Sequence, residues 1–236
     1  MNLRQKYHIP SDAILTIAGT VGVGKSTMTS ALANALDFRT SFEKVESNPY
    51  LDLFYLDFKR WSFHLQIYFL AERFKEQKKI FEYGGGFVQD RSIYEDTGIF
   101  AKMHYEKGTM DKVDYETYTS LFEAMVMTPY FPHPNLLIYL EGSFEDILTR
   151  INIRGRPMEQ QTPTSYWKEM YERYDTWISG FNVCPVLRLN IKDYDIFEDI
   201  GSIEPIVKKI ANKLNQSTRM TKKIKETRIN LSMKKY

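Results

Sequence analysis

Short apolar runs alternate along the chain with longer stretches in which apolar residues recur every three or four positions. The short runs predict strands and the longer periodic stretches predict helices. The predicted strands are residues 13–18, 39–43, 87–90, 136–141 and 186–189. The predicted helices are residues 25–36, 48–57, 61–82, 93–107, 112–127, 144–154, 164–181 and 203–215. This alternation predicts an α/β fold with a five-stranded parallel sheet flanked by helices.

The composition supports a single folded domain. The chain has 236 residues, of which 43% are hydrophobic and 14% aromatic, and this excludes disordered, collagen-like and low-complexity proteins. No apolar stretch reaches the roughly 18 residues of a membrane span. Residues 1–10 also lack the apolar centre of a secretion signal. We therefore expect a cytoplasmic protein that makes no membrane contact.

Cysteine and histidine usage excludes two kinds of structural site. The single cysteine, Cys184, has no partner within the chain for a disulfide. The four histidines show no metal-ligand spacing with it. Disulfides and structural zinc are therefore not expected.

Positive charge gathers at the C-terminal end. Residues 216–236 carry seven bases and one acid, a net of +6, so the remainder carries 2 − 6 = −4. We expect residues 1–215 to form the folded domain and residues 216–236 to form a mobile basic tail. Because a nucleic-acid binder usually carries its positive charge on the folded body, we expect no specific nucleic-acid partner.

The most specific motif is the loop Gly19-Thr20-Val21-Gly22-Val23-Gly24-Lys25-Ser26, which matches the phosphate-binding pattern and is followed by Thr27. A predicted strand precedes it and a predicted helix follows, so backbone N–H groups and a helix N-terminus converge on one anion. The Lys25 ammonium adds a positive charge, and the Ser26 hydroxyl can join the coordination of Mg²⁺. The loop predicts binding of a nucleoside triphosphate with Mg²⁺.

GTPases, motor ATPases and small-molecule kinases share this loop. A GTPase would carry an Asn-Lys-x-Asp motif, and the nearest string, Asn212-Lys213-Leu214-Asn215, lacks the aspartate. A motor ATPase would place an acid after an unbroken apolar strand, whereas Gln89 interrupts the strand predicted at residues 87–90. These departures favour a small-molecule kinase.

Two acids and an arginine stand at the carboxyl ends of predicted strands: Glu43 after the second, and Asp90 with Arg91 after the third. In open α/β sheets ligands bind beyond these ends. Hydroxyl phosphorylation needs a carboxylate for the hydroxyl proton and cations for the transferring phosphoryl group. Each acid alone would equally fit a solvated side chain or an ion pair, but their joint placement favours a site.

A second group lies on the predicted helix 61–82. Gln66 and Arg73 are seven residues apart and so share a face, with Phe69 beside them. A buried amide and guanidinium next to a ring could hold a nucleobase by its edge and face. The spacing equally permits both side chains to point at solvent.

A third group starts the predicted helix 93–107. Ser92 and Glu95 have the spacing of a capping box, which gives both a structural role. Asp96 and Phe100 follow, four residues apart on one face.

Three arginines border the last candidate segment. Arg150 and Arg154 are neighbours on one helical face, and Arg156 follows a glycine at the start of a proline-flanked stretch. Residues 154–163 would suit a lid that closes over a triphosphate and excludes water. A solvated basic helix end is the alternative.

Together these residues resemble the deoxynucleoside kinase family, closest to its bacterial members that act on deoxyadenosine and deoxycytidine. The resemblance spans about residues 14–214, and its specific parts are Glu43-Lys44-Val45, Tyr55, residues 61–68, Asp90-Arg91-Ser92 and Arg154-Gly155-Arg156. It implies a three-layer P-loop kinase fold. It also implies 5′-phosphorylation of deoxyadenosine, deoxycytidine or deoxyguanosine by ATP with Mg²⁺, in deoxynucleotide salvage.

The resemblance assigns the sugar-side roles residue by residue. Glu43 matches the acid near the substrate 5′-hydroxyl, although Lys44 stands where the family motif has proline. Tyr55 and Glu159 match the pair that meets the 3′-hydroxyl. Arg91 matches the arginine near the 5′-oxygen.

It assigns the base-side roles in the same way. Gln66 matches the amide that reads the base edge, and Phe100 the aromatic ring stacked on the base. Arg73 with Asp96 match the pair that selects adenine, cytosine or guanine over thymine. For the donor, Lys25 and the three arginines Arg150, Arg154 and Arg156 are expected to contact ATP.

Between the two acids, we expect Glu43 to accept the 5′-hydroxyl proton and Asp90 to lie on the magnesium side. Asp90 ends the strand beside the phosphate loop and Ser26, whereas Glu43 leads into the helix that carries Tyr55.

Three further interpretations remain. Relatives in the family are dimers joined through long helices, so a homodimer is expected. A nucleoside monophosphate kinase shares loop and lid, but it needs an extra arginine where this chain has Tyr55 and Glu159. An ATP-gated binding protein tethered to nucleic acid by its tail is the alternative from another class.

Overall fold

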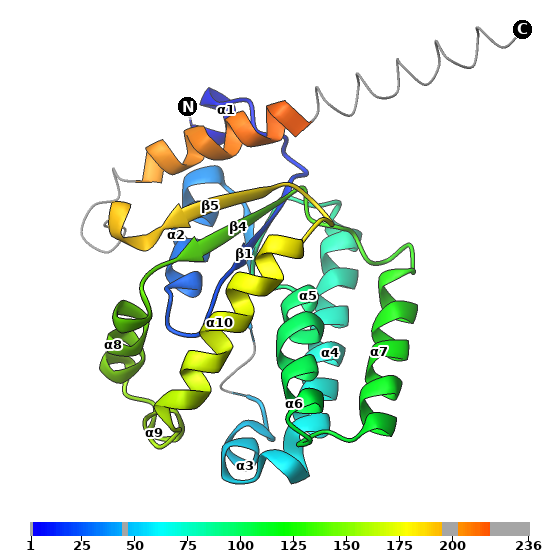
Figure 1. Ribbon diagram of the computed structural model, residues 1–236. Coiled ribbons are helices and arrows are strands. Elements are labelled where there is room, and N and C mark those ends of the chain that lie inside the picture. The colour runs from blue at the N-terminus through cyan, green and yellow to red at the C-terminus, as the bar shows by residue number, and fades with distance from the viewer. Residues whose placement is uncertain (1, 44–46, 195–202, 218–236) are drawn as a thin grey trace, which may run out of the picture.

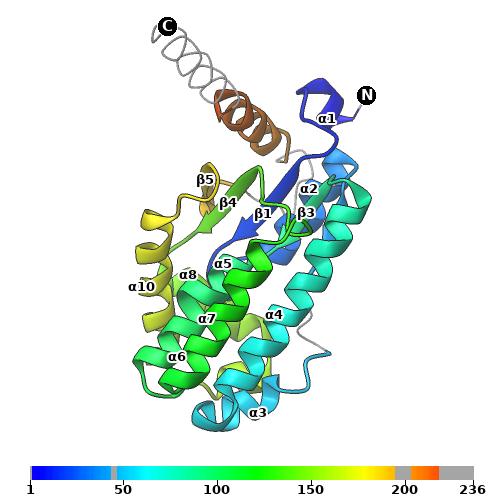
Figure 2. The same ribbon diagram turned by 90° about the vertical axis from the view of Figure 1, so that its right-hand side faces the viewer.

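The computed structural model describes residues 2–43, 47–194 and 203–217. A parallel sheet with helices packed on both of its faces forms the centre (Figures 1 and 2). Its strands are β1 Ile14–Ala18, β2 Arg39–Ser41, β3 Phe87–Asp90, β4 Leu136–Glu141 and β5 Val186–Asn190, in the order β2-β3-β1-β4-β5. The predicted three-layer fold with a five-stranded parallel sheet is confirmed in the described ranges.

The central strands are covered on both faces, which explains the nearly unbroken apolar sequences of β1 and β4. All residues of β1 and β3 are buried, and β4 is buried up to its last residue. β1 pairs in parallel with β3, and Ile17 lies opposite Asp90. This register places the end of β3 beside the loop that leaves β1.

The helices are α1 Leu3–Lys6, α2 Lys25–Leu36, α3 Leu51–Leu56, α4 Phe58–Tyr83, α5 Ile93–Glu95, α6 Lys102–Glu106, α7 Lys112–Val126, α8 Phe144–Arg154, α9 Pro157–Gln160 and α10 Thr164–Gly180. A π-helical segment, η1 Asp96–Ala101, and a 3₁₀ turn, η2 Ile191–Asp193, complete the named elements. Residues 203–217 are also helical. The bounds of α2 and α8 match the sequence prediction, whereas α1 and α9 were not predicted.

Three apolar clusters of the described residues hold the layers together, and the smallest joins Ile80 of α4 to Ile14 of β1 and Phe87 of β3. The largest one joins the sheet to α2, to α10 and to the helix at residues 203–217. The second one lies between α4, the α5–α6 segment and α7, around the fully buried ring of Tyr118. These three helical segments stand side by side in Figure 2.

Parts of the sequence prediction lie outside the described residues. Lys44 is one of them, and the predicted basic tail is described only at residues 216 and 217, which continue the preceding helix. Among the helices of the described ranges, none combines the length and the apolar character that crossing a bilayer requires.

Candidate active site

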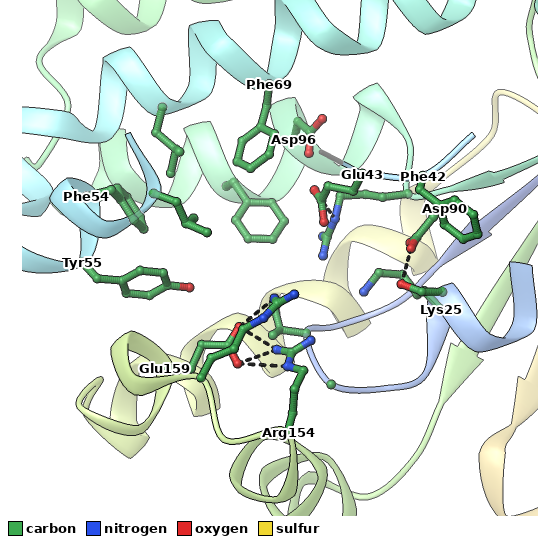
Figure 3. Close-up of a pocket in the computed structure, with 18 of the residues that line it drawn as sticks. Lys25, Phe42, Glu43, Phe54, Tyr55, Phe69, Asp90, Asp96, Arg154 and Glu159 are labelled. Atoms are coloured by element: carbon green, nitrogen blue, oxygen red, sulfur yellow. Dashed lines mark hydrogen bonds and ion pairs between the residues drawn. The ribbon is translucent and has the colours of Figure 1, made fainter. Parts of the chain in front are cut away.

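A cavity of about 880 Å³ opens beyond the carboxyl ends of β1, β2 and β3. Its walls come from the phosphate loop, from the residues after β2 and β3, from α3, α4 and η1, and from α8 and α9 (Figure 3). The size is that of a small-molecule site. Residues that the sequence analysis selected from separate segments therefore surround one space.

The phosphate loop folds as its glycines allow. Gly22 has a φ of +83°, and a side chain there would meet Ile151 of α8 at 2.7 Å. Lys25 Nζ donates to the carbonyl oxygens of Gly19 at 2.8 Å and Thr20 at 2.9 Å. Burial, with a smaller effect of the Arg91 charge, lowers the pKa of Lys25 to about 8. A bound anion would favour its charged form.

Asp90 and Ser26 meet at the start of α2. The Ser26 hydroxyl donates to Asp90 Oδ2 at 2.5 Å, and Asp90 Oδ1 is buried without a hydrogen-bond partner among the described residues. In the described chain, no three His, Cys, Asp or Glu side chains cluster to hold a metal by themselves. One carboxylate and one hydroxyl beside a phosphate site are what Mg²⁺ uses together with phosphate oxygens and water. These residues therefore fit Mg²⁺ that binds with a triphosphate.

Glu43 binds two buried arginines. Its Oε1 atom lies 3.0 Å from Arg73 Nη2 and 3.0 Å from Arg91 Nε. Burial would raise the pKa of Glu43, but the Arg91 and Arg73 guanidiniums outweigh burial and hold this pKa below its usual range. The cavity wall therefore carries an ionised carboxylate, which can accept a hydrogen bond from a substrate hydroxyl.

Arg91 is fixed in an unusual backbone conformation. Its φ is +69°, where a non-glycine residue is strained by roughly 1–2 kcal/mol. Its backbone N–H donates to Ile17 O at 2.9 Å, and its guanidinium donates to the Tyr174 hydroxyl. The guanidinium carbon also lies 4.8 Å from the centre of the Phe100 ring. Strain of this kind gathers at functional sites.

The far end of the cavity combines buried polar groups with aromatic walls. Gln66 is 2% exposed and Arg73 is 5% exposed, so the solvent-facing alternative for this pair is wrong. Arg73 Nε donates to Asp96 Oδ2 at 3.0 Å, and burial raises the pKa of Asp96 to about 6 although Arg73 opposes this. Within residues 2–43, 47–194 and 203–217, the buried Gln66 Oε1 atom has no hydrogen-bond partner. Polar atoms thus remain for a flat, hydrogen-bonding ligand.

The lid segment, residues 154–163, lies across the cavity from Asp96 (Figure 3). Arg154 donates to Glu159 from Nη2 at 2.6 Å and from Nε at 3.1 Å, and Arg156 Nη1 lies 3.4 Å from the same carboxylate. Tyr55 points into the space beside Glu159 (Figure 3). Burial and the Glu159 charge raise the pKa of Tyr55 well above its usual value, so its hydroxyl stays neutral. Arg150, Arg154 and Arg156 all line the cavity. This disfavours the alternative in which they form only a solvated basic helix end.

Most of the selected residues line the cavity. These are Val21, Gly22, Gly24, Lys25, Ser26, Thr27, Glu43, Tyr55, Gln66, Asp90, Arg91, Asp96, Phe100, Arg150, Arg154, Arg156 and Glu159. Arg73 does not line it but supports three groups that do, since it binds Glu43, Asp96 and the Asp90 carbonyl. Gly19, Thr20 and Val23 belong to the loop without lining the cavity.

Several aromatic side chains that were not assigned a role from the sequence also form walls of the cavity. Phe42, Phe54 and Tyr166 line the cavity, as does Phe69, the ring expected beside Gln66 and Arg73. Phe42 precedes Glu43 and Phe54 precedes Tyr55, so adjacency to a selected residue was the one available signal. The chain has 15 phenylalanines, and residue type alone does not separate these from core residues.

Comparisons with known proteins agree with this geometry. A sequence model of the family described as deoxynucleoside kinase matches residues 15–215. The chain is 70% identical over 213 residues to a deoxyadenosine/deoxycytidine kinase of Bacillus subtilis, covering 90% of this chain and 98% of that protein. It is 39% identical to a deoxyadenosine kinase of Dictyostelium discoideum, covering 76% and 73%. A solved structure of deoxyadenosine kinase from M. mycoides with bound dATP superposes with a TM-score of 0.70, 30% identity and coverage of 84% and 98%.

Proposed function

The chain belongs to the deoxynucleoside kinase family and phosphorylates deoxynucleosides, and we propose that it transfers the γ-phosphoryl group of ATP, with Mg²⁺, to the 5′-hydroxyl of deoxyadenosine and deoxycytidine. One observation carries the proposal. A single cavity joins the phosphate loop at one end to Gln66 and Asp96 at the other, with Glu43 between them. We place the reaction in deoxynucleotide salvage in the cytoplasm.

On the donor side, the loop amides, Lys25 and the lid arginines bind the triphosphate. Ser26 and Asp90 would hold Mg²⁺, which neutralises charge on the phosphoryl group when bound. As phosphate oxygens reach Arg154 and Arg156, Glu159 becomes free to bind another group. The lid then excludes water that would otherwise hydrolyse the triphosphate.

On the acceptor side, Glu43 accepts the proton of the 5′-hydroxyl as the oxygen attacks. Arg91 keeps Glu43 ionised and lies near the oxygen that gains charge. The Tyr55 hydroxyl and Glu159 bind the 3′-hydroxyl. Positioning and charge stabilisation supply most of the catalysis, because phosphoryl transfer requires little covalent work from the protein.

The base is selected by Gln66, Arg73 and Asp96. Adenine and cytosine carry an exocyclic amino group where thymine carries a carbonyl oxygen. The Asp96 carboxylate accepts a hydrogen bond from that amino group but repels the thymine carbonyl. Phe69 and Phe100 provide the apolar faces on either side of the ring.

We predict an acid limb in the pH profile that belongs to Asp96. Its carboxylate must be ionised to accept from the amino group, so kcat/KM for deoxyadenosine should fall as the pH drops through about 6. Glu43, whose pKa is held low, stays ionised in that window. The Asp96→Asn protein should have a lower kcat/KM for deoxyadenosine, and this value should not change with pH across the same range. A wild-type profile that is flat down to pH 5, measured at saturating ATP, would contradict this role.

A coupled assay with ATP and Mg²⁺ tests the proposed substrates. The acceptors are deoxyadenosine, deoxycytidine, deoxyguanosine, thymidine and the deoxynucleoside monophosphates. We expect turnover with deoxyadenosine and deoxycytidine and none above background with thymidine. Turnover confined to the monophosphates would overturn the roles of Tyr55 and Glu159, and thymidine turnover equal to that of deoxycytidine would overturn the role of Asp96.

We propose that the protein is a homodimer joined through α4 and α7, which stand next to each other in Figure 2. Val113, Leu121 and Ala124 are exposed on α7 at helical spacing, with Thr117 between them. Leu121→Arg should raise the monomer fraction in sedimentation velocity. Val183→Arg is the matched control, since Val183 is 40% exposed and Leu121 39%. Equal sedimentation of the Leu121→Arg, Val183→Arg and unmodified proteins would contradict this interface.

A further inference from the structure

Glu95 is a fully buried carboxylate that does not line the cavity. Its exposed fraction is 0%, and it lies between the phosphate loop and Arg91. A buried carboxylate is costly unless hydrogen bonds and opposite charge compensate. Its contacts therefore indicate what the charge is kept for.

One carboxylate oxygen performs the structural task that the sequence predicts. Glu95 Oε2 accepts from the Ser92 backbone N–H at 2.8 Å and lies 3.1 Å from Ser92 Oγ, completing the capping box at the start of α5. Glutamine serves as well as glutamate in a capping box. The capping box therefore explains neither the negative charge of Glu95 nor the position of its second carboxylate oxygen.

The second carboxylate oxygen of Glu95 contacts residues that belong to the active site. Glu95 Oε1 accepts from the Gly19 backbone N–H at 3.2 Å and from the Tyr174 hydroxyl at 3.0 Å. It also lies 3.8 Å from Arg91 Nη1. The Tyr174 hydroxyl in turn accepts from Arg91. One oxygen thus touches the phosphate loop, a tyrosine and an arginine.

These contacts connect the two halves of the site. The Gly19 peptide is held on both sides, since its N–H donates to Glu95 and its carbonyl accepts from Lys25 Nζ. Arg91 is likewise shared, since it contacts Glu95 through Nη1 and Glu43 through Nε. Glu95 therefore acts through Gly19 on Lys25, which binds the phosphate donor. It acts through Arg91 on Glu43, which binds the phosphate acceptor.

We propose that Glu95 is a positioning residue that holds the phosphate loop and Arg91 in one fixed relation. It keeps the Lys25 ammonium and the Glu43–Arg91 pair at the spacing that phosphoryl transfer requires. Misplacing reacting groups by about 1 Å costs on the order of 100-fold in rate. This inference rests on the proposed function, because it assumes the roles given there to Lys25, Glu43 and Arg91.

Glu95→Gln tests the proposal with little change in shape. The amide can keep its oxygen on Ser92, but its NH₂ group then faces the Gly19 N–H, donor against donor; turning the amide moves the conflict to the Ser92 N–H. We expect kcat to fall about 10- to 100-fold and the KM for ATP to rise, while the KM for deoxyadenosine changes by less than about threefold. The melting temperature is measured alongside.

Ser92→Ala is the matched control. It removes the hydroxyl from the same capping box but leaves the Oε1 contacts with Gly19, Tyr174 and Arg91 in place. It should lower the melting temperature and leave kcat nearly unchanged. If Glu95→Gln keeps near-normal kcat, or if Ser92→Ala lowers kcat as much for an equal loss of melting temperature, Glu95 is merely structural and the proposal fails.

Tyr174→Phe keeps the proposal testable if Glu95→Gln does not fold. It removes one hydroxyl that joins Glu95 to Arg91 and preserves the buried ring. We expect kcat to fall by about tenfold with the KM for deoxyadenosine nearly unchanged, and an unchanged kcat would overturn the proposal. The unmodified protein in the same assay reports the proposed function, so the variant-to-wild-type ratio tests the positioning role separately.

Discussion

Replacing Glu43 by glutamine is expected to lower kcat for deoxyadenosine by about a thousandfold. The amide nearly preserves the shape of the side chain but cannot take the 5′-hydroxyl proton, and it removes the negative charge that both Arg73 and Arg91 contact at 3.0 Å. The KM for deoxyadenosine should change by only a few fold, because Gln66, Asp96, Tyr55 and Glu159 still bind the base and sugar. Steady-state kinetics at saturating ATP measure both constants.

The matched control is Glu76→Gln. The side chains of Glu76 and Glu43 are both 16% exposed, and Glu76 binds Ser41 and Lys79 outside the cavity. It should retain nearly normal kcat. A Glu43→Gln protein that also turns over at a near-normal rate would sink the assignment of Glu43 as the proton acceptor.

The second large effect is expected from Asp90→Asn. Its buried Oδ1 atom has no hydrogen-bond partner in the part of the chain that the structure describes, and Oδ2 accepts from the Ser26 hydroxyl. Because Mg²⁺ prefers carboxylate oxygens, the variant should require a higher Mg²⁺ concentration for half-maximal rate, and kcat should fall by about 100-fold. A titration with MgCl₂ at fixed ATP measures both.

The two variants are distinguished by their Mg²⁺ dependence. Glu43→Gln should keep the wild-type Mg²⁺ midpoint, whereas Asp90→Asn should shift it upward. Removing Mg²⁺ with a chelator should abolish turnover of the unmodified protein. A shifted midpoint in Glu43→Gln with an unshifted one in Asp90→Asn would reverse the two roles.

Much of the fold follows from local sequence. β3 and β4 have the predicted bounds because each begins with an apolar run and ends at an acid. α2 and α8 also match, since each is bounded by a glycine in the left-handed region, Gly24 before α2 and Gly155 after α8. Such positions favour glycine and mark helix ends in the sequence.

Other elements differ from the sequence prediction. The predicted helix at residues 93–107 contains the π-helical segment η1, which carries Asp96 and Phe100 to the cavity. α4 begins at Phe58 rather than at Trp61, because Asp57 accepts from the Arg60 backbone N–H and caps it earlier. β2 ends at Ser41, so Glu43 lies in the connection after the strand.

The candidate site likewise contains features that local sequence predicts and features that depend on contacts between distant segments. The phosphate loop is local, and its eight residues could be identified from their spacing. The joining of Glu43 to both Arg73 and Arg91 brings together three segments far apart in sequence, and no pattern within one segment predicts it. The same holds for the contact of Glu95 with Gly19, since the capping-box spacing accounts for only one of its oxygens.

The central claim is that this cavity delivers the γ-phosphoryl group of ATP to the 5′-hydroxyl of a deoxynucleoside. The most direct measurement uses ATP labelled with ¹⁸O in its γ-phosphoryl group, together with deoxyadenosine and Mg²⁺, and follows the label by mass spectrometry and ³¹P NMR. The claim predicts that the label appears in deoxyadenosine 5′-monophosphate, and that this product and ADP form in equal amounts. Label found in the 3′-monophosphate, or only in inorganic phosphate, would contradict it.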